Sequence, residues 1–180
     1  MRIALPVALV VAFVVVGMGD VAEAGGGAGG GEPGFAATHV RCLSRDARGL
    51  LDLARSRSPL IRSLVERLEQ SDVVVYLQLP GDSNPQATAS YLTFVAFAAG
   101  TRYVLVQIDP WRTIPLDRLA LLGHELYHAL EIAEEPGVRD APTLCALYRR
   151  IGHECGRGQF ETEPARVAGR RVQAEVSGPR

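Results

Sequence analysis

The chain has 180 residues, of which 19 are basic and 20 are acidic, and this length is typical of one compact domain. Every basic residue is arginine, so the chain cannot form a Schiff base through lysine or supply the lysine of a phosphate-binding loop. Because the net charge is close to zero and the arginines are scattered, we expect no nucleic-acid partner.

The first 24 residues are typical of an export signal. Arg2 precedes an almost wholly apolar run over residues 3–18, and residues 22–24 (Ala-Glu-Ala) offer the small side chains of a cleavage site. We therefore expect residues 1–24 to be a cleaved signal peptide and the protein to be secreted or periplasmic. An uncleaved anchor is the alternative, but the apolar run is shorter than the roughly 20 residues of a spanning helix. No stable membrane span is expected after cleavage.

A glycine-rich stretch over residues 25–35 follows the expected signal peptide. Such a backbone loses too much conformational entropy to order itself, so this stretch is expected to be a flexible linker. The folded domain is then expected over residues 36–180.

The first half of this domain predicts two amphipathic helices followed by three strands. The helices are expected over residues 46–54, with Asp46 as N-cap, and over residues 58–68, where a Ser-Pro pair begins the apolar spacing. β-branched and apolar runs predict strands at residues 73–79, 91–98 and 103–108. The short turn at residues 99–101 makes the last two strands a hairpin.

The second half predicts three further helices. The longest is expected over residues 115–135, with leucines at three- and four-residue steps and a proline in its first turn. Asp140 can cap a helix over residues 141–151, and a last helix is expected over residues 161–176. Helices before and after a block of strands predict an α+β fold, with a small antiparallel or mixed sheet of about three strands.

The candidate catalytic residues lie in the segment 124–128, which has the sequence His-Glu-Leu-Tyr-His. Two histidines four apart on a helix project from one face, so His124 and His128 can bind one metal ion. Between them, Glu125 can reach a metal-bound water. The pattern therefore predicts a catalytic site with one Zn²⁺ ion, and the alternative is a pair of core or surface histidines that binds no metal.

This HExxH motif resembles that of the zincin metallopeptidases, and specifically their gluzincin branch, over residues 72–176. In that branch a glutamate from a later helix completes the histidine pair, which implies Glu161 as the third ligand and Glu163 as the alternative. In thermolysin-like members an aspartate four residues after the ligand glutamate supports a ligand histidine, but Ala165 has that position here.

Two related families fit less well. The metzincin branch needs a glycine and a further histidine after the pair, and Glu131 and Glu134 stand at those positions. Peptide deformylases take a cysteine ligand from a Gly-Cys-Leu-Ser stretch, which residues 41–44 match only without the glycine. Glu131 lies roughly 7 Å along the helix axis from the midpoint of the histidines, so it is expected to hydrogen-bond a ligand instead of binding the metal.

The resemblance implies an exported zinc-dependent hydrolase, a metallopeptidase that acts on a peptide or protein through a metal-activated water with Glu125 as general base. The group that stabilises the oxyanion stays open among His153, Tyr148 and Tyr127. Because the domain is small for a peptidase, the alternative is an exported zinc-binding domain without activity, which serves a structural or partner-binding role.

The three cysteines predict one disulfide bond. Cys145 and Cys155 are ten residues apart, so the chain can bring them together, whereas Cys42 is distant in sequence. Cys42 is expected to stay a buried, reduced thiol.

Overall fold

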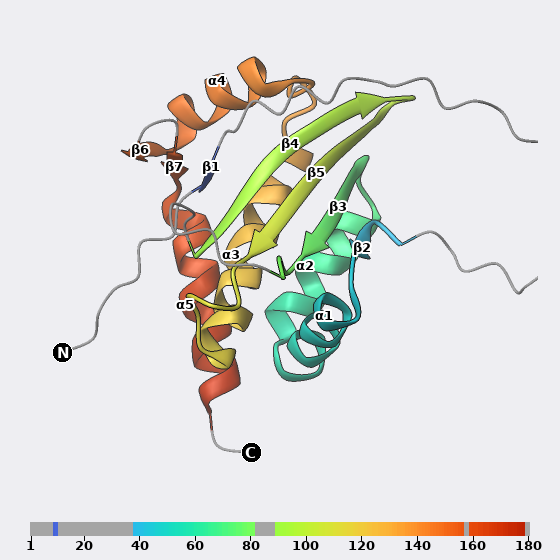
Figure 1. The fold of residues 1–180 in the computed structure, drawn as a ribbon. Coiled ribbons are helices and arrows are strands. Elements are labelled where there is room, and N and C mark those ends of the chain that lie inside the picture. Colours follow the sequence, from blue (N-terminus) through green and yellow to red (C-terminus); the bar gives the residue numbers. More distant parts are fainter. Residues whose placement is uncertain (1–8, 11–37, 82–88, 157–158, 179–180) are drawn as a thin grey trace, which may run out of the picture.

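A computed structural model describes residues 9–10, 38–81, 89–156 and 159–178 of the chain (Figure 1). The expected linker over residues 25–35 and the expected signal peptide over residues 1–24, apart from Leu9–Val10, lie outside these residues. The described part is α+β, as the sequence predicts. It contains five helices and a mixed four-stranded sheet, with a smaller antiparallel sheet beside it.

The main sheet has the strand order β2-β3-β5-β4. Its strands are β2 (Val40–Cys42), β3 (Val73–Gln78), β4 (Ser90–Ala98) and β5 (Thr101–Ile108). β3 pairs in parallel with β2 and β5, whereas β4 runs antiparallel to β5 and forms one edge of the sheet. The expected number of about three strands is one too few, because β2 has only three residues and is defined by its pairing with β3.

The turn between β4 and β5 consists of Ala99 and Gly100. Both residues have positive φ angles, of 49° and 78°, and Ala98 pairs with Thr101 across the turn. Two left-handed residues suit the right-handed twist of the strands, which confirms the expected hairpin. Ser90 is the first residue of β4, which is an edge strand of this sheet.

The helices agree with the sequence in order and differ from it at their ends. They are α1 (Arg45–Arg57), α2 (Pro59–Glu69), α3 (Pro115–Ala133), α4 (Ala141–Ile151) and α5 (Glu163–Ser177). The N-cap of α1 is Ser44 and not Asp46, because the Ser44 hydroxyl accepts the backbone N–H of Ala47 at 3.1 Å.

A second, small sheet lies between α4 and α5, where no strand was expected. It consists of β6 (His153–Gly156) and β7 (Gln159–Glu161), which are antiparallel, and β1 (Leu9–Val10) pairs with the other side of β7. Glu161 is therefore the last residue of a strand. The expectation that it lies in the first turn of the final helix is wrong, because Thr162 is the N-cap of that helix.

The expected disulfide bond is also wrong, because Cys42, Cys145 and Cys155 are free thiols in the described part of the chain. Cys155 lies on β6, and its Sγ atom hydrogen-bonds to the Gln159 carbonyl on β7 at 3.6 Å. The thiol is thus bonded within the β6–β7 pair, while Cys145 belongs to α4.

The long helix α3 lies behind the main sheet, with α2 and α5 on either side (Figure 1). Its leucines at positions 119, 122 and 126 are fully buried and share one hydrophobic core with Val104 and Val106 of β5. The expected leucine spacing therefore places one face of α3 in the core.

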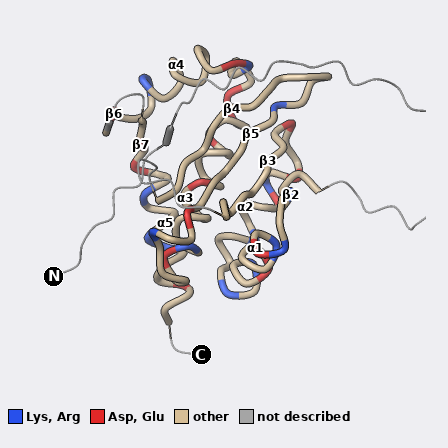
Figure 2. The backbone as a smooth tube through the Cα atoms, viewed as in Figure 1, with Lys and Arg blue, Asp and Glu red and all other residues tan. Residues whose placement is uncertain are grey.

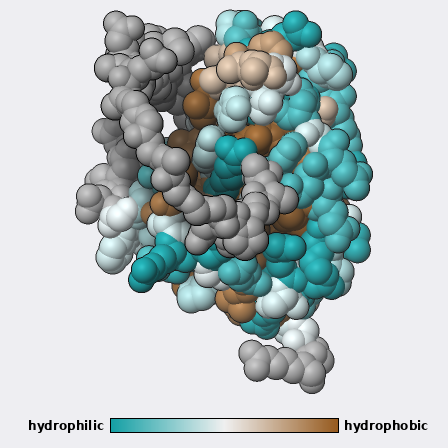
Figure 3. Space-filling model, turned by 90° about the vertical axis from the view of Figure 1, so that its right-hand side faces the viewer, coloured by the Kyte–Doolittle hydropathy of each residue, from teal (hydrophilic) through white to brown (hydrophobic). Residues whose placement is uncertain are grey.

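The surface of the described residues carries charges of both signs. Figure 2 shows basic and acidic residues together on α1 and α5. On the face seen in Figure 3, hydrophilic residues cover much of the described surface, with hydrophobic residues between them. Among the described helices, none is both long enough and apolar enough to cross a membrane.

Candidate metal centre

The centre of α3 is buried where this helix meets α5. Two glycines permit the close approach: a Cβ atom on Gly123 would lie 2.5 Å from Val172 Cγ2, and one on Gly169 would lie 3.4 Å from His124 Cβ. Because α5 covers α3 this closely, the side chains of His124 and His128 are buried, with residue exposures of 3% and 0%.

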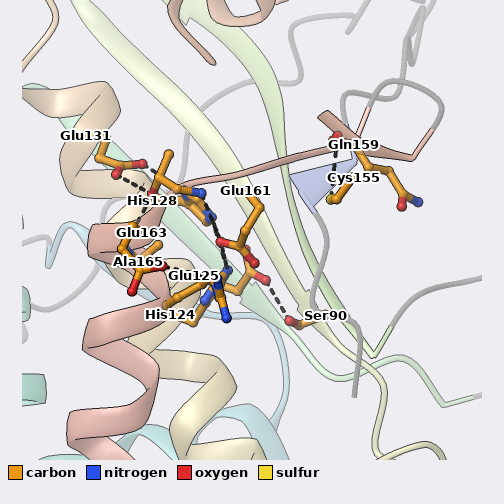
Figure 4. Close-up of polar contacts among 12 residues, drawn as sticks. Ser90, His124, Glu125, His128, Glu131, Cys155, Gln159, Glu161, Glu163 and Ala165 are labelled. Carbon is orange, nitrogen blue, oxygen red and sulfur yellow. Dashed lines mark hydrogen bonds and ion pairs between the residues drawn. The ribbon is translucent and has the colours of Figure 1, made fainter. Parts of the chain in front are cut away.

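Glu161 brings a carboxylate to this histidine pair from the end of β7 (Figure 4). One ligand atom from each of His124, His128 and Glu161 lies within 4.8 Å of the other two. The two Nε2 atoms are 3.1 Å apart, and Glu161 Oε1 lies 3.5 Å from His124 Nε2 and 3.8 Å from His128 Nε2. This buried His-His-Glu group could hold a metal ion.

Glu125 lies beside this group and is fully buried (Figure 4). Its Oε1 atom accepts a 2.6 Å hydrogen bond from the Ser90 hydroxyl, whereas its Oε2 atom has no hydrogen-bond partner among the described residues. Burial raises the pKa of Glu125 to about 7. An unpaired carboxylate oxygen therefore lies beside the group that could hold a metal ion.

The outward nitrogen of His128 is held by Glu131. His128 Nδ1 donates to Glu131 Oε2 at 2.7 Å, and Glu131 Oε1 accepts the Thr162 hydroxyl at 2.6 Å. Burial lowers the pKa of His128, but the hydrogen bond and the nearby carboxylates outweigh it and raise the pKa above 6.5. A proton held on Nδ1 leaves the Nε2 lone pair for a metal.

Burial shifts the pKa values of His124 and Glu161 in opposite directions. Burial and the neighbouring His128 lower the pKa of His124 well below 6.5, although a hydrogen bond to the Ala165 backbone opposes the shift. His124 therefore stays neutral, as a metal ligand must be. Burial raises the pKa of Glu161 to about 7, while the Thr162 backbone N–H donates to Glu161 Oε1 at 2.9 Å.

The other residues that the sequence singled out lie around the group or away from it. Glu163, the alternative third ligand, is exposed and pairs with Arg166 and Arg170, so it does not join the group. Tyr127 is partly buried, and His153 is exposed on β6, opposite Glu161 in the strand register.

Tyr148 packs against His128 and hydrogen-bonds to its backbone. It is fully buried, its hydroxyl donates to the His128 carbonyl at 3.1 Å, and its ring meets the His128 ring edge-on at 5.4 Å. Burial raises the pKa of Tyr148 well above 10, so the hydroxyl stays a donor. Its bond to the backbone supports His128.

Sequence reasoning missed two residues of the site, Ser90 and Thr162. Ser90 carries no local signal, because its partner Glu125 is 35 residues away. Thr162 does carry one: it precedes Glu163-Pro164, and a threonine followed by proline in the first turn is a helix N-terminus signature.

Comparisons of the chain with protein-family models, with curated proteins and with solved structures find no match.

Proposed function

We propose that this protein is an exported zinc-dependent hydrolase of peptide bonds, with zinc bound by His124, His128 and Glu161. The observation that carries the proposal is the buried His-His-Glu group beside a carboxylate with one unpaired oxygen. Structural zinc sites have four protein ligands, whereas catalytic sites have three, and two histidines with one glutamate are a known catalytic set. The apolar run over residues 3–18 supports export.

Bound zinc would supply Lewis-acid chemistry, because it lowers the pKa of a water ligand and polarises a scissile carbonyl. Glu125 supplies the proton transfers. Ser90 holds Glu125 Oε1, which leaves Oε2 to accept a proton from the attacking water and return it to the leaving amine. A pKa of about 7 suits both steps near neutral pH.

The position of β4 supports an extended peptide as substrate. β4 is an edge strand of the main sheet, and its first residue, Ser90, contacts Glu125. An extended peptide can add to the edge strand of a sheet as a further strand. A peptide held there would run past the proposed general base.

The second candidate function is zinc binding without catalysis. It is favoured by the burial of the ligand side chains, since His128 is inaccessible and Glu161 is only 5% exposed. A metal held this deeply would stabilise the packing of β7 and α5 on α3.

The experiment that separates the two compares the wild type with Glu125→Gln and with Glu163→Gln as a surface control. Each protein is loaded with zinc, its metal content is measured, and it is incubated with a mixed peptide library. The hydrolase predicts equal zinc in all three and a loss of cleavage on the order of 10²-fold or more in Glu125→Gln alone. Zinc without cleavage in the wild type supports the second candidate.

A further inference from the structure

Thr162 lies at the junction of β7 and α5, where its hydroxyl makes two hydrogen bonds and its backbone N–H makes a third. As the N-cap of α5, its Oγ1 atom accepts the Ala165 backbone N–H at 3.3 Å. The same hydroxyl donates to Glu131 Oε1 at 2.6 Å, and the Thr162 backbone N–H donates to Glu161 Oε1 at 2.9 Å. Thr162 is 1% exposed, so water does not compete for these contacts.

These bonds connect two of the proposed ligands through one residue. In one direction, the Thr162 hydroxyl holds Glu131, whose other oxygen holds His128 Nδ1 at 2.7 Å. In the other direction, the backbone N–H holds Glu161 directly. A hydroxyl has one hydrogen and can accept as well, so the cap and the bond to Glu131 are satisfied at the same time.

We propose that Thr162 is a positioning residue that couples the orientations of His128 and Glu161 and thereby sets the metal affinity of the site. The proposal rests on the metal site of the proposed function. Partners that orient a ligand from outside the coordination sphere typically contribute 10- to 100-fold to metal affinity. Thr162 acts one step further out on His128, through Glu131, and acts directly on Glu161.

If Thr162 acted only as a helix cap, its replacement would affect stability and not the metal affinity of the site. Loss of an N-cap destabilises a helix wherever that helix lies, and it does not by itself weaken a distant metal site. Ser44 offers the matched case, because its hydroxyl caps α1 through Ala47 and α1 carries none of the proposed ligands.

The test is the zinc dissociation constant, measured by competition with a chromophoric chelator at one pH. Thr162→Val keeps the shape and removes the hydroxyl, so we expect zinc binding to weaken about 10- to 100-fold. Thr162→Ser should restore wild-type affinity, and Ser44→Ala should leave it unchanged. The absorption spectrum of the Co²⁺-loaded protein should change in Thr162→Val and not in Ser44→Ala.

The route through Glu131 is tested with a second variant. Glu131→Gln leaves Thr162 in place and should weaken zinc binding to a similar extent. In the double variant the two losses should not add, because both remove the same link to His128. Should Thr162→Val fail to fold, Glu131→Gln and Thr162→Ser still test the link.

Three results would overturn the proposal: wild-type affinity in folded Thr162→Val, an equal loss in Ser44→Ala, or full additivity in the double variant. If Thr162→Val does not fold, wild-type affinity in Glu131→Gln overturns it. Failure of the hydrolase is distinguishable, since it appears as a wild type that binds zinc and cleaves no peptide. A wild type that binds no zinc overturns both.

Discussion

The Ser90 hydroxyl donates a 2.6 Å hydrogen bond to Glu125 Oε1, and the other oxygen of this carboxylate has no partner among the described residues. The contact joins the first residue of the edge strand β4 to the centre of α3. It fixes which carboxylate oxygen is held and which one is available for proton transfer.

Replacing Ser90 with alanine should therefore reduce turnover without removing the metal. The Glu125 carboxylate would lose a hydrogen bond worth about 1–3 kcal/mol, which corresponds to a fall in kcat of roughly 5- to 150-fold. Steady-state kinetics on a peptide that the wild type cleaves, with zinc content measured in parallel, checks this. Unchanged kcat in Ser90→Ala would show that the contact does not position the carboxylate.

The stability of the metal-free protein should depend on pH through Glu125. Burial raises the pKa of Glu125 from 4.5 to about 7, so the folded state binds the proton more tightly than the unfolded state. This contribution to stability is fully present below pH 4.5 and is lost as pH rises through about 7.

The comparison with Glu125→Gln isolates that contribution. The free energy of unfolding of the wild type, minus that of Glu125→Gln, should fall by roughly 3 kcal/mol across this range, at about 1.4 kcal/mol per pH unit. Urea denaturation of both proteins in a chelator, at several pH values, measures the difference. A difference that stays constant with pH would mean that Glu125 ionises without penalty.

The close packing of α3 on α5 should make Gly123 intolerant of a side chain. A Cβ atom there would lie 2.5 Å from Val172 Cγ2, so Gly123→Ala should destabilise the protein by about 1–3 kcal/mol. Gly49, in α1, is the control, because its Cβ would have no described atom within 4 Å. Gly49→Ala should stabilise by about 0.5–1 kcal/mol. Thermal unfolding measures the change in stability of both variants. Equal changes would contradict the close approach of α3 and α5.

Arg102 should be the most sensitive arginine in the described part of the chain. Only 2% exposed, it pairs with Asp72 and donates to the carbonyls of Ile132, Ala133 and Glu135 at the end of α3. Arg102→Met leaves these acceptors unpaired, so we expect a loss of about 3–5 kcal/mol in the free energy of unfolding.

An exposed arginine provides the control for that prediction. Arg166 forms a surface ion pair with Glu163, and Arg166→Met should change stability by less than about 1 kcal/mol. Chemical denaturation of both variants measures the contrast. Similar losses in the two would show that Arg102 does not hold the end of α3.

Local signals in the sequence accounted for the elements that carry the site. The leucine spacing and Pro115 predicted α3, and the β4–β5 hairpin followed from its short turn, because both patterns depend on neighbours in the chain. β2 was missed because Val40–Cys42 is too short for a pattern and is stabilised by its pairing with β3. The start of α5 was misplaced although the Thr162 cap was visible in the sequence.

The arrangement of the site was less accessible to sequence reasoning. The contacts of Ser90 with Glu125 and of Thr162 with Glu131 span 35 and 31 residues. Neither contact has a spacing rule, since each is created only when β4 and α5 pack on α3. Glu161 was predicted as a metal ligand only through the resemblance to the gluzincin metallopeptidases. Its position in the chain alone does not indicate that it reaches the histidines.

The most direct test of the account is calorimetric titration of zinc into the metal-free protein, with Glu161→Gln and Glu163→Gln beside the wild type. Both glutamates lie at the junction of β7 and α5, but only Glu161 belongs to the buried group. We predict one zinc ion per chain in the wild type and in Glu163→Gln, and binding weakened on the order of 10²-fold or more in Glu161→Gln. No binding to the wild type, or wild-type binding in Glu161→Gln, would contradict the proposed metal site.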